Sequence, residues 1–160
     1  MKRISQKLRW KVADDLTDLP KKEAKLLALA KSSLANAHAP YSNFKVGAAL
    51  LLENGVMMGG SNQENAAYPM CLCAERVALS AAASQQPNVI VKTMAITVKA
   101  PTQIIDQPAM PCGSCRQALC EIEQKQKKPI KLVIQGEIGD IYVFKSASDI
   151  LPFSFDASFL

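Results

Sequence analysis

Two short cysteine-containing segments constrain the fold of this chain more than any other feature. CLCAER, residues 71–76, and PCGSCRQ, residues 111–117, hold four of the five cysteines. Cys112 and Cys115 have the C-x-x-C spacing that is common in zinc sites. Alone that spacing would be only suggestive, but together with Cys73 and Glu75 it becomes specific. If cysteines of both segments bind one metal ion, the fold must bring the two segments together.

Both segments lie where a strand or loop is predicted to run into a helix. The first-turn N–H groups of a helix are unpaired, and the helix dipole favours negative charge there. Thiols at such positions have lowered pKa values, and the thiolate is the form that binds a metal. The predicted starts of the two helices are therefore suited to holding a metal ion.

Hydrophobic patterning predicts one α/β sheet. Apolar runs bounded by turn residues indicate strands, and Asn54-Gly55 between two such runs predicts a hairpin. The predicted strands are 45–52, 55–61, 91–100, 131–135 and 141–145. The predicted helices are 21–38, 73–84, 113–125 and a short one in 146–152. This order implies a sheet covered by helices on both sides.

The first residues form a separate feature. Residues 7–12, KLRWKV, alternate basic and apolar side chains, which predicts an edge strand that buries Leu8, Trp10 and Val12. We expect residues 1–19 to be an N-terminal extension with this edge strand, and residues 20–160 to be one domain.

Composition excludes several classes of function. The net charge of +5 comes largely from the two basic segments at 2–11 and 125–128, which a solvated face explains. No run alternates basic and aromatic residues, so a nucleic-acid partner is not expected. No secretion signal and no membrane span are apparent. We expect a cytoplasmic protein, in which clustered cysteines are metal ligands or catalytic groups rather than disulfides.

The number of cysteine ligands separates two kinds of zinc site. Four thiolates, including Cys71, would make a closed structural site, whereas Cys73, Cys112 and Cys115 alone would leave a fourth position open for water. The one-residue spacing between Cys71 and Cys73 is shorter than usual, which favours three ligands. Glu75 also favours the open site, because a zinc-bound water needs a nearby proton acceptor. A non-enzymatic Cys₄ module stays the alternative.

The C-A-E and P-C-x-x-C segments resemble the zinc-dependent cytidine deaminase superfamily, whose general mechanism is well described. Cys73 stands where nucleic-acid-editing members typically have histidine, so the chain resembles the small homotetrameric deaminases of free nucleosides. The similarity runs from about residue 22 to the C-terminus. The segments that carry it are YSNFKVGAAL at 41–50, NQENAAYP at 62–69, CAERVAL at 73–79, PCGSCRQ at 111–117 and LPFSF at 151–155.

The resemblance implies a fold and a reaction. The fold is a three-layer α/β/α sandwich around a mixed five-stranded sheet. The reaction is hydrolytic deamination of free cytidine and deoxycytidine to uridine and deoxyuridine, in pyrimidine salvage, by a zinc-activated water. One zinc per subunit is held by Cys73, Cys112 and Cys115, and Glu75 carries the proton. A homotetramer is implied, with active sites shared between subunits.

The resemblance also implies residues that bind the nucleoside. Asn62 and Glu64 lie two apart, so on an extended segment they point the same way and can hold a ribose hydroxyl; the family places them at the 3′ position. Phe44 packs near the base, and backbone groups of Ala66 and Ala74 read its polar edge. A C-terminal phenylalanine reaches a neighbouring subunit's site and stacks on the base; Phe155 matches it, with Phe153 a weaker candidate.

Residues next to the zinc ligands have expected supporting roles. We expect Arg76, Arg116 or both to donate a hydrogen bond to a zinc-bound sulfur, and Gln117 to belong to the same supporting set. A deaminase for a modified cytosine nucleoside, of the blasticidin type, stays a close alternative. Phe155 and the N-x-E pair favour cytidine over it.

Overall fold

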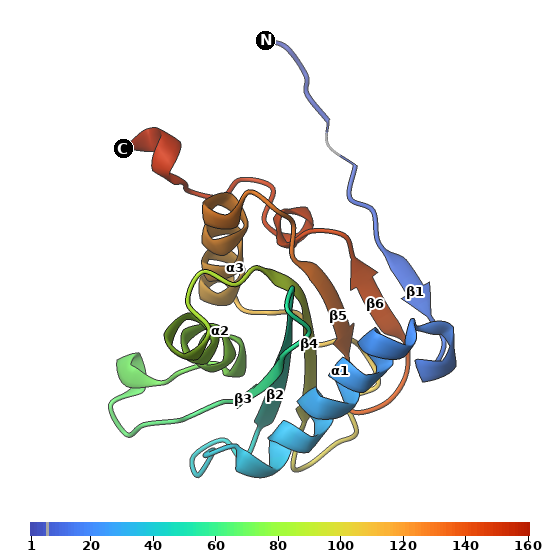
Figure 1. Cartoon of the computed structure of the whole chain (residues 1–160). Coiled ribbons are helices and arrows are strands. Elements are labelled where there is room, and N and C mark those ends of the chain that lie inside the picture. The colour runs from blue at the N-terminus through green and yellow to red at the C-terminus, as the bar shows by residue number, and fades with distance from the viewer. Residues whose placement is uncertain (6) are drawn as a thin grey trace.

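The computed structural model describes residues 1–5 and 7–160. Its centre is a mixed six-stranded sheet in the order β1-β6-β5-β4-β2-β3 (Figure 1). Only β4 and β5 pair in parallel among the strand pairs of the described residues. The strands are β1 Lys11–Ala13, β2 Lys45–Leu52, β3 Met57–Ser61, β4 Val91–Lys99, β5 Lys131–Gln135 and β6 Ile141–Phe144.

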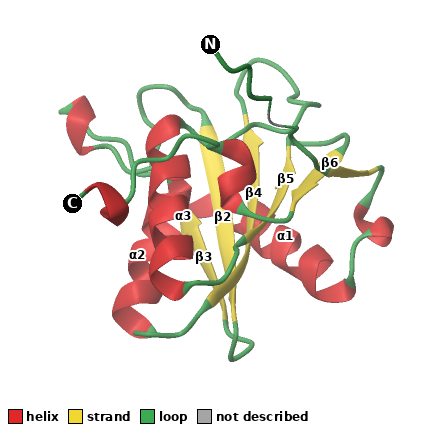
Figure 2. Cartoon of the chain, turned by 90° about the horizontal axis from the view of Figure 1, so that it is seen from above, coloured by secondary structure: helices red, strands yellow, loops and turns green. Residues whose placement is uncertain are grey.

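Helices cover both faces of this sheet, which confirms the three-layer sandwich (Figure 2). Helix α1, Lys21–Ser33, lies on one face, and α2, Ala74–Gln85, and α3, Gly113–Gln126, lie on the other. The side chains of β2 explain why both faces are covered. Ala48 and Leu50 pack in the core under α2 and α3, and Ala49 and Leu51 pack in the core under α1. Successive side chains of a strand point to opposite faces, so one fully apolar strand supplies two cores.

The expected five-stranded sheet is wrong by one strand. The N-terminal extension adds β1, which pairs antiparallel with β6 at Lys11↔Val143 and Ala13↔Ile141. The edge of β6 offers unpaired backbone N–H and C=O groups, and β1 satisfies them.

The predicted strand 7–12 is also corrected in extent and in its buried face. The strand begins at Lys11, and Leu8, Trp10 and Val12 stay 53%, 48% and 50% exposed. Ala13 is the residue of β1 that enters the core.

Helix α1 ends earlier than the predicted 21–38. It ends at Ser33 and continues only as a 3₁₀ turn to Asn36. The backbone of His38 instead bonds to the segment after β3: its N–H donates to the Asn62 carbonyl and its carbonyl accepts from the Glu64 N–H. This long-range pairing holds His38 outside the helix.

A close approach of β3 to α2 positions the start of α2. A Cβ on Gly60 would lie 2.7 Å from both the Ala74 carbonyl oxygen and the Ala78 nitrogen. Only glycine leaves room for the helix to lie this close to the strand. Among the helices of the described residues, none combines the length and the apolarity needed to cross a membrane.

Candidate active site

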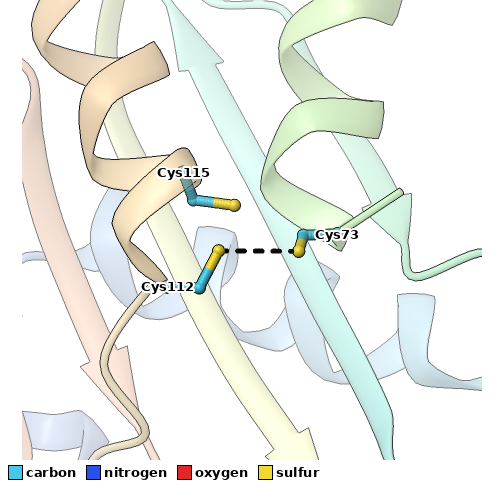
Figure 3. Close-up of side chains that lie close together, drawn as sticks. All are labelled: Cys73, Cys112 and Cys115. Carbon is cyan, nitrogen blue, oxygen red and sulfur yellow. Dashed lines mark hydrogen bonds between the residues drawn. The ribbon is translucent and has the colours of Figure 1, made fainter. Parts of the chain in front are cut away.

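Three cysteine thiols meet where the N-terminal ends of α2 and α3 lie side by side (Figure 3). Cys73 is the N-cap of α2, Cys112 is the N-cap of α3, and Cys115 lies in the first turn of α3. The Sγ atoms of Cys73 and Cys112 are 3.8 Å apart, and all three Sγ atoms lie within 4.8 Å of one another. A tetrahedral zinc with Zn–S bonds of about 2.3 Å requires S···S separations of about 3.8 Å. The cluster therefore fits a zinc ion with three thiolate ligands and one open position.

The pKa values of the Cys73 and Cys115 thiols are shifted in opposite directions. Hydrogen bonds from Cys115, and then from Cys112 and Arg76, lower the pKa of Cys73 to about 5 against the opposing effect of burial. The bond to Cys73 and burial together raise the pKa of the Cys115 thiol well above its usual range. The neighbours of Cys73 thus favour its thiolate, which is the form that binds a zinc ion.

Cys71 and Cys120 lie outside this cluster. The Cys71 Sγ accepts a hydrogen bond from the Asn65 N–H at 3.2 Å, and Cys120 is buried within α3. Cys73, Cys112 and Cys115 are the one set of three or more His, Cys, Asp or Glu side chains in the described part of the chain whose ligand atoms converge in this way. The arrangement favours the open three-cysteine site over a closed Cys₄ site.

Glu75 lies in the first turn of α2 and is only 4% exposed. Burial, reinforced by the negative charge of Cys73, raises the pKa of its carboxyl, and a hydrogen bond with Cys115 partly opposes this. A carboxyl whose neutral form is favoured beside the thiols can both accept and return a proton.

The two arginines that follow the ligands have different contacts. Arg76 helps to lower the pKa of the Cys73 thiol, and its Nη2 donates to the Cys71 carbonyl at 2.9 Å. Its Nε is buried and has no hydrogen-bond partner among the described residues. Arg116 instead donates to two carbonyls, of Pro111 at 2.7 Å and of Ile150 at 3.1 Å. Of the two arginines, Arg76 is the one that affects the pKa of a cysteine in the cluster, and its expected role at a zinc-bound sulfur stays a prediction.

The two expected ribose-binding residues hold the segment between α1 and β2. Asn62 accepts from the Val46 N–H at 2.8 Å and donates to the Phe44 carbonyl at 2.9 Å. Glu64 accepts from the N–H groups of Tyr41 and Ser42 and from the Ser42 hydroxyl. The same side chains thus fix the backbone around Phe44, which is half-buried.

The other expected substrate contacts lie in different surroundings. Ala74 is buried in the first turn of α2, and Ala66 is exposed in the loop before it. Phe155 is 59% exposed and stacks on Phe159, with ring centroids 5.5 Å apart. The chain ends beyond α3, away from the sheet (Figure 1).

Ser42 is a contact that the sequence did not single out. Its hydroxyl donates to Glu64 and accepts from the Phe44 N–H, so it links two expected substrate residues. Serine before asparagine indicates a turn, and nothing local shows that its partner lies in a loop after β3.

Comparison with protein families matches residues 20–128 to the cytidine and deoxycytidylate deaminase zinc-binding region. The chain is 42% identical over 121 residues to a cytidine deaminase of Halalkalibacterium halodurans, which covers 76% of this chain and 84% of that protein. It is 40% identical over 93 residues to a probable cytidine deaminase of Dictyostelium discoideum, covering 58% of this chain and 60% of that protein.

Solved structures show the same likeness. The crystal structure of cytidine deaminase from Burkholderia pseudomallei matches with a TM-score of 0.72 and 39% identity, covering 82% of this chain and 97% of that one. The cytidine deaminase from Mycobacterium tuberculosis matches with a TM-score of 0.62 and 27% identity, covering 82% and 94%. Residues 1–19 lie outside the matched family region.

Proposed function

The chain belongs to the cytidine and deoxycytidylate deaminase family of zinc-binding enzymes, and we propose that it hydrolyses free cytidine and deoxycytidine to uridine and deoxyuridine. The observation that carries the proposal is the cluster of Cys73, Cys112 and Cys115 with the buried Glu75 two residues after its first member. Three ligands leave one coordination position open, as in catalytic zinc sites.

Each residue of the cluster has a distinct task in this reaction. Zinc, when bound, supplies a Lewis acid that makes water nucleophilic at neutral pH. The three cysteines hold the ion, and Arg76 offsets the negative charge that they bring to it. Glu75 takes one proton of the attacking water and gives it to N3 of the cytosine ring. It then takes the second proton, from the hydroxyl now on C4, and gives it to the amine, which leaves as ammonia. Burial favours the protonated form of Glu75, so the side chain can hold each proton between its removal and its delivery.

Substrate binding is proposed from the family pattern. Asn62 and Glu64 bind the ribose at its 3′-hydroxyl, Phe44 packs near the base, and the backbone at Ala66 and Ala74 reads its polar edge. Phe155 stacks on the base in the site of a neighbouring subunit of a homotetramer. The exposed ring of Phe155 is compatible with this role. No residue is assigned to the 2′-hydroxyl, so both sugars are accepted, which suits a role in pyrimidine salvage.

The ultraviolet spectrum of cytidine during incubation with the zinc-loaded protein tests the proposal. We expect conversion to the uridine spectrum, with the same result for deoxycytidine. Glu75→Gln should keep one zinc per chain and lose at least about a hundredfold in rate, because the proton transfers lose their carrier. The control Glu121→Gln removes an exposed carboxylate on α3 and should react as the unchanged protein does.

Two results would contradict the proposal. An unchanged cytidine spectrum with one zinc bound would remove free cytidine as a substrate. Loss of zinc from the Glu75→Gln protein would make Glu75 a ligand rather than the proton carrier.

A further inference from the structure

Three consecutive residues of α3 contact three different parts of the molecule. Successive residues of a helix are rotated by about 100°, so Cys115, Arg116 and Gln117 project in different directions. Cys115 points to the other thiols, Arg116 binds two carbonyls, and Gln117 binds the backbone of Phe155. We refer to residues 111–115 as the zinc loop and to residues 151–160 as the C-terminal tail.

Arg116 ties the zinc loop to the segment from which the tail departs. Its Nε donates to the carbonyl of Pro111, the residue before Cys112, and its Nη1 donates to the carbonyl of Ile150, at the end of the 3₁₀ helix Ala147–Ile150. Pro111 and Ile150 are both buried. The planar guanidinium can satisfy both acceptors only while the zinc loop and this 3₁₀ helix keep their relative position.

The start of the same 3₁₀ helix is anchored independently. The buried carboxylate of Glu123, about two turns after Arg116 on α3, accepts hydrogen bonds from the Ser146 hydroxyl, the Ala147 N–H and both polar groups of Ser148. It also accepts from the Ile130 N–H before β5. Glu123 fixes the start of the 3₁₀ helix. A movement of its other end, at Ile150, would therefore change the hydrogen bond from Arg116 and the position of the tail.

Gln117 binds the backbone of Phe155 in the tail and does not bind its aromatic ring, which stacks on Phe159. Its Nε2 donates to the Phe155 carbonyl at 2.7 Å, and its Oε1 accepts from the Phe155 N–H at 3.3 Å. Gln124, two turns along α3, donates to Asp156 at 3.3 Å. Side chains of α3 therefore hold the tail through the main chain of Phe155 and the carboxylate of Asp156, while the Phe155 ring is 59% exposed.

We propose that Arg116 and Gln117 are positioning residues that couple the order of the C-terminal tail to occupancy of the zinc site. A metal ion that holds Cys112 keeps the Pro111 carbonyl in place for Arg116, which in turn keeps Ile150 and the start of the tail in place for Gln117. Such a coupling is reciprocal, so an ordered tail also favours retention of zinc. The consequence for substrate rests on the proposed function: without zinc, Phe155 is no longer presented to a neighbouring site.

Hydrogen exchange of the full chain, with zinc and after chelation, tests the coupling without relying on activity. The reporter is the peptide 151–160, and the internal reference is the buried strand β2, residues 45–52. In the unchanged protein we expect the tail to exchange about fivefold or more faster without zinc. The reference peptide should exchange equally in both states, which distinguishes local release of the tail from general unfolding.

Variants separate the two positioning residues. Gln117→Ala should keep its zinc but show fast tail exchange in both states, because the bonds to Phe155 are absent. It should also raise KM for cytidine more than it lowers kcat.

The Arg116→Gln protein should bind zinc more weakly, and its tail exchange should no longer depend on zinc. The matched control Gln85→Ala, an exposed glutamine at the end of α2, should behave as the unchanged protein.

Equal tail exchange with and without zinc in the unchanged protein would overturn the coupling. So would a zinc-dependent tail in the Gln117→Ala protein. If the coupling is observed but cytidine is not converted, the proposed function fails and the coupling stands, so the two failures are distinguishable.

Discussion

At the scale of single residues, two cysteines separated by one position have different partners. Cys73 is the N-cap of α2 and lies within the cluster, whereas the Cys71 sulfur bonds to the backbone of Asn65. The extended backbone at Cys73 places it at the helix end, where unpaired N–H groups and the dipole stabilise a thiolate. Cys71 precedes this end, and its sulfur lies outside the cluster.

Replacement of single cysteines tests this difference. Cys71→Ser should retain one zinc per chain, because only a hydrogen bond to the loop backbone is lost. Cys112→Ser should lose most of its zinc, since the ligand set falls to two thiolates. Metal analysis after dialysis against a moderate chelator measures both. Loss of zinc from the Cys71→Ser protein would instead support a four-cysteine site.

At the scale of elements, side chains after β3 fix the segment between α1 and β2. Asn62 and Glu64 make their hydrogen bonds to residues 41–46, so they organise the surroundings of Phe44 before any substrate arrives. Hydrogen bonds from Ser42 and then from the Tyr41 N–H lower the pKa of the Glu64 carboxyl below its usual 4.5.

The stability of this segment should therefore depend on pH. A carboxyl with a lowered pKa in the folded state stabilises the fold above its ordinary pKa, and that contribution is lost as the pH falls from there toward the folded-state pKa. Glu64→Gln should lower Tm at neutral pH, and the difference from the unchanged protein should shrink below pH 4.5. Thermal unfolding across this range, with Glu121→Gln as control, measures it. A difference that grows toward acid pH would be inconsistent with an ionised Glu64 at the turn.

At the scale of the whole molecule, the N-terminal extension enlarges the sheet. Strand β1 covers the edge of β6, and the Trp10 ring packs against Tyr142 and Phe144, with centroids 6.0 and 6.2 Å apart. Residues 1–19 lie outside the matched family region. We propose that they are an addition to a single domain, residues 20–160, that stabilises the sheet without contributing to the zinc site.

Trp10→Ala tests this role of the extension. Because Trp10 is about half exposed, we expect the free energy of unfolding to fall by roughly 1–2 kcal/mol, less than for a fully buried tryptophan. Zinc content and the rate with cytidine should not change. Urea unfolding measures the stability, and Ile4→Ala, at a side chain that is 91% exposed, is the control. An equal effect of both variants would remove the aromatic contact as the cause.

The sequence predicted the regular elements well where the signals are local. Strands β2 and β5 have the predicted bounds, and α2 and α3 begin and end within one residue of prediction. Apolar runs, turn residues and helix ends act within a few positions, so they can be read along the chain. Helix α1 was predicted too long because His38 is held by a segment after β3.

The same division holds for the site. By itself the sequence determined the candidate zinc ligands and Glu75, because ligand type, spacing and position at a helix start are local properties. Only the tertiary structure decided that Arg116 binds the carbonyls of Pro111 and Ile150, that Asn62 and Glu64 hold the segment around Phe44, and that the sheet has a sixth strand. Each of these depends on partners distant in the sequence, whose positions relative to one another are set by packing across the sheet.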